Sequence, residues 1–75
     1  MVASLVLVEG EKVIGENLFI PLTDVDEVLV GSADGFGHLV ALVAKSTSDL
    51  DGAVRGLAQV PNVTGVLTLA TKLSP

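Results

Sequence analysis

The chain has no cysteine, tryptophan or tyrosine, and its only aromatic residues are Phe19 and Phe36. Without cysteine it forms no disulfide and no thiolate metal site, a composition that fits a reducing cytosol. Without aromatic side chains it offers no stacking platform for single-stranded nucleic acid. Four cations stand against nine acids, for a net charge of −5, whereas nucleic-acid binding needs a basic footprint. We therefore expect no direct binding of nucleic acid.

Long hydrophobic runs are also missing, because no apolar stretch approaches the ~18 residues that a membrane-spanning helix needs. The segment from Met1 to Val8 has no basic residue before its apolar part, so it does not resemble a signal peptide. These two observations predict a cytoplasmic protein that does not cross a membrane.

What the chain has in abundance is small aliphatic side chains. Its 75 residues, enough for one domain, are 49% hydrophobic, and their mean hydropathy is +0.70. A chain of this size buries only about 60% of the surface that its unfolded form exposes, and small domains without disulfides often depend on oligomerisation. We therefore expect a homodimer or a larger homo-oligomer.

Four apolar segments are typical of β-strands. The first and third are apolar at every position or nearly so, which indicates strands covered on both faces. In the fourth, strict alternation would place Leu67, Leu69, Thr71 and Leu73 on one face and Thr68 and Lys72 on the other. The predicted strands are Val2–Val8, Val28–Val30, Leu39–Ala44 and Val66–Leu73.

In two segments the apolar residues recur at the spacing of an α-helix. Ser46 and Ser48 are candidate N-caps for a helix whose core-facing positions are Leu50, Val54 and Leu57, and which ends before Pro61. The segment 11–22 places Ile14, Leu18 and Leu22 at helical spacing, although Gly15 and Pro21 weaken a helix there. The alternative is a hairpin in which Val13–Ile20 pairs with Val2–Val8.

If both helices form, the order of elements is strand-helix-strand-strand-helix-strand. Right-handed connections then give an α+β, ferredoxin-like βαββαβ fold, with a four-stranded antiparallel sheet and both helices on one face. The other face would expose more apolar surface than monomers usually tolerate. We therefore predict a face-to-face dimer of sheets, with Leu5, Leu7, Val40 and Leu42 at the interface.

Catalytic residue patterns are weak. The single histidine, His38, lies beside glycines but has no cysteine partners for a metal. The acids Asp24, Asp26 and Glu27 lack the glycine and closing glutamate of a calcium loop. The polar run Ser46–Asp49 has no accompanying base and is explained by helix capping. We expect no enzyme activity, no metal and no cofactor.

The order of elements, together with three motifs, resembles the RAM domain, the effector-binding domain of Lrp/AsnC transcription regulators. The motifs are Leu22–Val28, the glycine loop that precedes Leu39–Val43, and Val60–Val63 followed by Thr68 and Leu69. The likeness covers nearly the whole chain and implies a stand-alone module without a DNA-binding domain. It implies a domain that dimerises through its sheets, often assembles further, and binds small amino-acid-like effectors between dimers.

By this resemblance, the effector site falls on the loop before the third strand, where the family has a Gly-x-Tyr-Asp motif. Gly35 matches that motif, whereas Gly37 replaces its aromatic residue and His38 its carboxylate. These two departures weaken the expectation of amino-acid binding more than that of assembly. The resemblance implies effector contacts from Gly35, Phe36, Gly37, His38 and Thr68.

A second ferredoxin-like family is similar too. The segment Ser4–Leu7 resembles the Ser-Leu-Val-Val strand that opens NapD, the maturation chaperone of periplasmic nitrate reductase, and the spacing from Leu42 to Val63 matches without a gap. That family binds a twin-arginine signal peptide, and the negative net charge here suits a basic peptide. The chain lacks the aromatic-His ending of that family's last strand.

Overall fold

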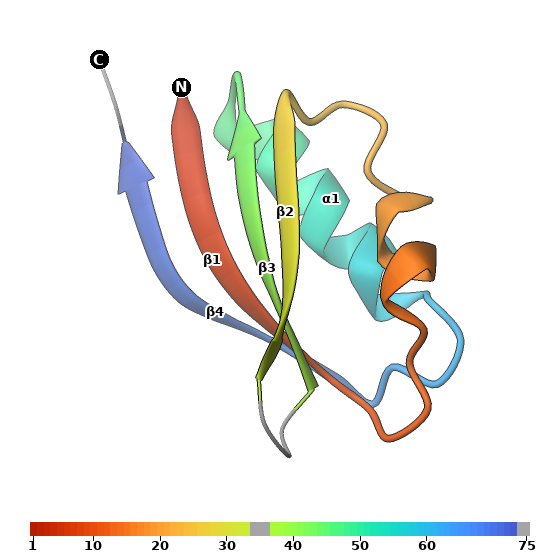
Figure 1. The fold of residues 1–75 in the computed structure, drawn as a ribbon. Coiled ribbons are helices and arrows are strands. Elements are labelled where there is room, and N and C mark those ends of the chain that lie inside the picture. Colours follow the sequence, from red (N-terminus) through yellow and green to blue (C-terminus); the bar gives the residue numbers. More distant parts are fainter. Residues whose placement is uncertain (34–36, 74–75) are drawn as a thin grey trace.

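The computed structural model describes residues 1–33 and 37–73 of the chain. Along these residues it forms one four-stranded antiparallel sheet with strand order β2-β3-β1-β4, covered on one side by a single α-helix (Figure 1). This α+β arrangement is compatible with a ferredoxin-like fold. The elements are β1 (Val2–Glu9), the 3-10 helix η1 (Gly15–Phe19), β2 (Glu27–Ala33), β3 (Gly37–Ala44), α1 (Thr47–Ala58) and β4 (Gly65–Leu73).

The strand β1 is the centre of the sheet, because it pairs with β3 on one side and with β4 on the other. Its residues Val2–Val8 are opposed by β3 without a break. The strand β2 pairs only with β3. The hairpin between Val2–Val8 and Val13–Ile20, considered from the sequence, is therefore wrong, since β3 and β4 occupy both edges of β1.

The helix expected over residues 11–22 is also wrong, and a five-residue 3-10 helix stands there instead. Gly15 and Pro21 bracket this segment, and no side chain caps its start at Ile14, so a longer α-helix has neither a start signal nor an uninterrupted interior. Two of the three apolar residues at helical spacing in this segment still reach the core. Leu18 and Leu22 are buried, whereas Ile14 is exposed.

The second predicted helix is confirmed as α1. The backbone N–H of Asp49 donates to the side-chain oxygen of Ser46 at 3.1 Å, so Ser46 is the N-cap. Leu50 and Leu57 are buried as their spacing predicts. After the helix, Asn62 has a φ of 72°, a left-handed conformation that asparagine adopts more easily than most residues.

The hydrophobic core lies between α1 and the two central strands. Side chains at alternate positions of β1 and β3 point toward the helix, as the period of a strand requires. The 3-10 helix and the segment after it close the core on the side of β2. The buried apolar residues are Val2, Val6, Val8, Leu18, Leu22, Val40, Leu42, Ala44, Leu50, Ala53, Leu57 and Val60.

A bulge interrupts the pairing of β4 with β1. Leu5 is opposed by Ala70 and Val6 by Thr68, so Leu69 has no opposing residue. The extra residue reverses the alternation of side chains beyond it. The expectation that Leu67 and Thr71 share a face is therefore wrong, because Thr71 lies opposite Ser4 on the helix side.

Next to the bulge, the buried hydroxyl of Ser4 donates to the backbone oxygen of Ala70 at 3.1 Å. The same hydroxyl lies 3.3 Å from the hydroxyl of Thr71. The one polar residue within Val2–Val8 therefore has partners beside the irregular part of the sheet, as a buried polar group requires.

Two glycines of α1 give a matched test of the packing between the helix and the segment before β2. A Cβ on Gly52 would meet nothing within 4 Å, whereas a Cβ on Gly56 would lie 2.7 Å from the Cβ of Pro21. We expect Gly52→Ala to raise the free energy of unfolding by about 0.5–1 kcal/mol, because alanine loses less backbone entropy in a helix. Gly56→Ala should lower it, because Pro21 must move. Urea denaturation measures both, and equal effects would contradict this packing.

Candidate functional site

The face of the sheet opposite α1 is the largest candidate site, and it is lined almost entirely by apolar side chains. Directly opposed residues share a face, so the strand registers arrange this face, called here the open face, in three rows that cross the sheet from β2 to β4. The first row is Glu27, Val43, Ala3 and Lys72; the middle row is Leu29, Ala41, Leu5 and Ala70; the third row is Gly31, Leu39, Leu7 and Leu67.

Exposure on the open face is greatest at the sheet edges. Leu29 on β2 is 73% exposed and Leu67 on β4 is 53% exposed, and even Leu5 on the central strand is 37% exposed. Three alanines on neighbouring strands make a shallow hollow beside Leu5, which is lined by Ala3, Ala41 and Ala70 among others. A monomer would leave this continuous apolar surface in water, which is unusual for a chain of this size.

The structure separates the four residues that the sequence assigned to the interface. Leu5 and Leu7 lie on the open face, but Val40 and Leu42 are fully buried in the core beneath α1. Their placement on the open face is therefore wrong. A strand whose faces are both apolar gives no signal of which set faces the helix, and in β3 the open face takes Leu39, Ala41 and Val43 instead.

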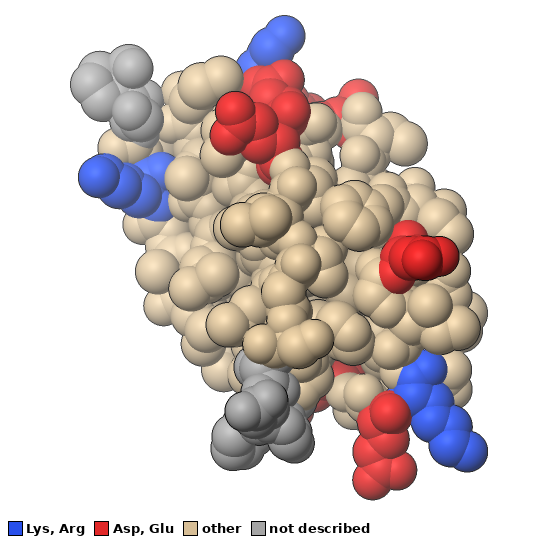
Figure 2. Space-filling view, in the orientation of Figure 1, with Lys and Arg blue, Asp and Glu red and all other residues tan. Residues whose placement is uncertain are grey.

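Charged side chains stand at the margin of the open face rather than within it. Figure 2, in the orientation of Figure 1, shows an uncharged expanse with acidic and basic groups around its edge. In the first row, Glu27 is carried by β2 and Lys72 by β4. These are the two edge strands, three strand spacings or about 14 Å apart, so the two side chains do not pair within one copy.

The effector residues implied by the resemblance lie elsewhere, and two of them, Gly35 and Phe36, are outside the described residues. Gly37 has a φ of 130°, and a Cβ there would collide with the backbone oxygen of Val8, so this position requires glycine. His38 is half-buried on the helix side of the sheet, and its Nε2 would lie 3.4 Å from a Cβ on Gly15.

The imidazole of His38 has one feature that the sequence did not predict. Its Nδ1 is buried without a hydrogen-bond partner among the described residues, a rare condition for a buried polar atom. The ring lies close to η1 rather than projecting freely into solvent.

Thr68, the remaining expected effector residue, is exposed on the helix side of β4, opposite Val6. His38 is opposed to Val8, one row away, and β1 lies between the two strands. The two side chains therefore share a face but are on the order of 10 Å apart. Gly37 and His38 are therefore neighbours in the structure, whereas Thr68 lies too far from them to form one site.

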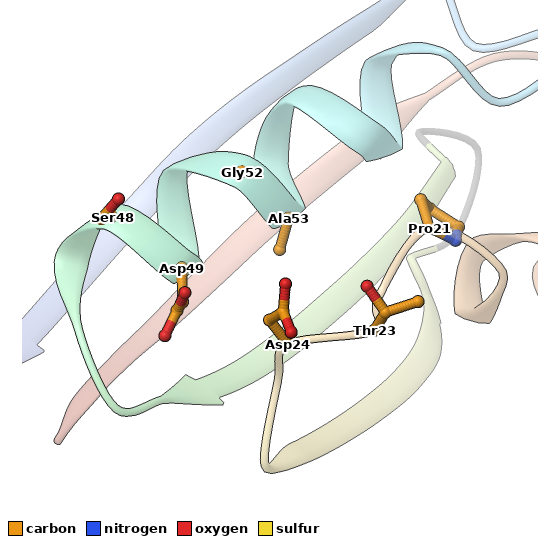
Figure 3. Close-up of a pocket in the computed structure, with 7 residues that line it drawn as sticks. All are labelled: Pro21, Thr23, Asp24, Ser48, Asp49, Gly52 and Ala53. Carbon is orange, nitrogen blue, oxygen red and sulfur yellow. The ribbon is translucent and has the colours of Figure 1, made fainter.

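A smaller hollow of about 180 Å³ separates the first turns of α1 from the segment before β2. Figure 3 shows the carboxylates of Asp24 and Asp49 in this gap, with Thr23 and Ala53 beside them. Its lining is polar and acidic. Across residues 1–33 and 37–73, no group of three or more metal-ligating side chains gathers here or elsewhere.

Comparisons with protein-family models, with curated proteins and with solved structures found no match for this chain. Over the described part of the chain, no helix is both long enough and apolar enough to cross a membrane.

The division of β1 and β3 into a covered face and an open face can be tested by truncating one leucine on each. Leu42→Ala should lower the free energy of unfolding by about 2–5 kcal/mol, because it leaves a cavity in the core. Leu5→Ala should lower the free energy of unfolding much less when the protein is too dilute to associate, because Leu5 is partly exposed in the single chain. Urea denaturation at low protein concentration measures both, and equal losses would show that the faces are assigned wrongly.

Proposed function

We propose that the chain is a non-enzymatic module that pairs with a second copy of itself through the open face and binds a small amino-acid-like effector. It would thus act like the ligand-binding domain of Lrp/AsnC regulators. The observation that carries the proposal is the open face: its three rows include two charged side chains, Glu27 and Lys72, both on edge strands, and a third, Glu9, lies beyond the third row at the end of β1.

The open face is large enough for a small interface between two copies. Its four strands lie about 4.8 Å apart and its three rows about 7 Å apart, so its projected area is on the order of 400 Å², about half of the ~800 Å² that each partner buries in a standard interface. The apolar character of the face suits self-association, because burial of apolar area is the main favourable contribution to association. A second copy of the same chain is always present to supply such a surface.

The ferredoxin-like assignment belongs to the same proposal. The strand order β2-β3-β1-β4 and the antiparallel pairing support it, with η1 in the place of the first helix. A short first connection leaves the helix side less fully covered, and the helix-side residues Thr68, Thr71 and Leu73 of β4 are exposed. The module proposed here is therefore a reduced form of the βαββαβ arrangement.

For the effector, we place the site at the end of the sheet that carries Gly37 and His38. The unpartnered Nδ1 of His38 is a group that a ligand carboxylate or hydroxyl could satisfy after a small movement of η1. Binding there would favour one assembly over another by population shift, because a ligand shifts an equilibrium by its difference in affinity for the two states.

Self-association is tested with two leucine-sized side chains of equal exposure. Leu29, on the open face, and Ile20, at the end of η1, are each 73% exposed. We expect Leu29→Asp to shift the wild-type dimer or larger oligomer toward monomer at micromolar concentration, because it places a carboxylate in the buried interface. Ile20→Asp should leave the mass unchanged.

Sedimentation equilibrium gives the mass, and circular dichroism confirms that both variants are folded. A wild-type protein that is monomeric at these concentrations would refute the proposal, as would two variants that dissociate equally.

Effector binding is tested by thermal unfolding in the presence of each of the twenty amino acids. A ligand at 100 times its dissociation constant should stabilise the folded state by about 2.7 kcal/mol. The shift should be lost in His38→Ala and kept in Ile14→Ala, a change on the exposed side of the same region. Unfolding temperatures that no amino acid raises would contradict this part of the proposal and leave self-association standing.

A second candidate is a NapD-like chaperone that captures a twin-arginine signal peptide as an added strand. The observation that favours it is β4, an edge strand of nine residues whose side chains are exposed from Leu67 to Leu73. Edge strands present unpaired backbone groups to an extended peptide. Titration with a twin-arginine peptide, against one with both arginines changed to glutamine, separates the candidates, since only the chaperone should bind, and bind the first peptide selectively.

A further inference from the structure

We infer that the two copies pack face to face about a two-fold axis that lies in the interface and runs along the strands, between β1 and β3. This inference rests on the self-association proposed above and specifies its geometry. Such an axis exchanges the edges of the sheet, so that β2 of one copy faces β4 of the other and β3 faces β1. Because aligned sheets pack at about 30°, the axis is inclined by roughly half that angle to the strands of each copy.

The middle row of the open face fits this axis by size. Its side chains alternate across the sheet as Leu29, Ala41, Leu5 and Ala70. Rotation about the axis reverses the row, so that Leu29 of each copy lies over the other copy's Ala70, and Leu5 over its Ala41. Each large side chain then enters the space beside a small one, which is how close-packed interfaces avoid voids.

The first row fits the same axis by charge. Its ends are Glu27 on β2 and Lys72 on β4, which do not reach each other within one copy. The rotation places Glu27 of each copy over the other copy's Lys72, so that two ion pairs close opposite sides of the interface. Complementary charges at a rim fix the register and suppress other arrangements.

The third row adds one further match. It runs Gly31, Leu39, Leu7 and Leu67, so that the exposed Leu67 of each copy lies over the other copy's Gly31. The two remaining leucines, Leu39 and Leu7, face each other near the axis. They are half-buried already, and together they form the most apolar part of the interface.

The other simple axis, across the strands, fits poorly. It would place the middle row over itself, with Leu5 against Leu5 and Ala41 against Ala41, which gives collisions at one point and a void at the next. It would also place the first row over the third, with Lys72 against Leu67 and Glu27 against Gly31. The charged ends would then be covered without partners, which is costly.

A charge exchange tests this geometry. We expect Glu27→Lys and Lys72→Glu each to raise the dissociation constant of the dimer roughly tenfold, because each turns two attractive pairs into repulsive ones. The double variant should return to within about threefold of the wild-type value. The matched controls are Asp51→Lys and Arg55→Glu, exposed charges on α1 that change the net charge equally. Their dissociation constants should stay near that of the wild type.

A size exchange gives an independent readout. Ala41→Leu should weaken the dimer although it adds apolar surface, because it fills the space that Leu5 of the other copy needs. Leu5→Ala combined with Ala41→Leu should restore the association. If the open face were a patch without a defined register, Ala41→Leu would instead tighten association.

These outcomes separate the geometry from the proposal on which it rests. A wild-type chain that stays monomeric overturns both. A wild-type dimer in which the double charge variant is no tighter than the weaker single variant, or in which Ala41→Leu tightens association, overturns the inferred axis and leaves self-association in place. Sedimentation velocity over a dilution series measures every dissociation constant.

Discussion

The packing of α1 against β1 and β3 is the contact on which the rest of this structure depends. The two central strands supply Val6, Val8, Val40 and Leu42, all fully buried or nearly so, and Leu57 meets them from the helix. With no cysteine in the chain, this single apolar layer holds the domain together. A chain of 75 residues has little more to offer, since small domains bury a modest share of their surface.

The same layer leaves a second surface exposed, because a sheet has two faces and α1 and η1 both lie on the same one. The first connection forms η1, which closes the core beside β2 with Leu18 and Leu22. The apolar side chains on the far side of β1 and β3 are left without cover, as they would be if the first connection formed a longer helix on the helix side. The proposal of self-association follows from this uncovered apolar face.

The two proposed activities draw on opposite sides of the sheet. Association uses the open face, whereas Gly37 and His38 stand on or near the covered side, at the end of β3. The adjacency of His38 to Gly15 links that end of the sheet to η1. In the proposed mechanism a ligand there acts on η1 and on the ends of β1 and β3, and the same strands carry the central residues of the interface. The coupling would therefore pass through the sheet itself rather than through a hinge between domains.

Local patterns in the sequence determined the elements whose signals lie close together in the chain. Ser46 caps α1, Leu50 and Leu57 face the core, and the four apolar segments became the four strands, because capping and periodicity act over a few residues. The segment 11–22 carried conflicting local signals, and packing decided between them by burying Leu18 within one short 3-10 turn.

Only the tertiary structure decided which face of each strand would be covered. In β3 every position is apolar from Leu39 to Ala44, so Val40 and Leu42 were as plausible on the open face as Leu39 and Ala41. In β4 the bulge at Leu69 reversed the alternation that the sequence implied. A one-residue shift turns every side chain of a strand to the other face. That choice is made by contacts with residues far away in the chain, which no local pattern contains.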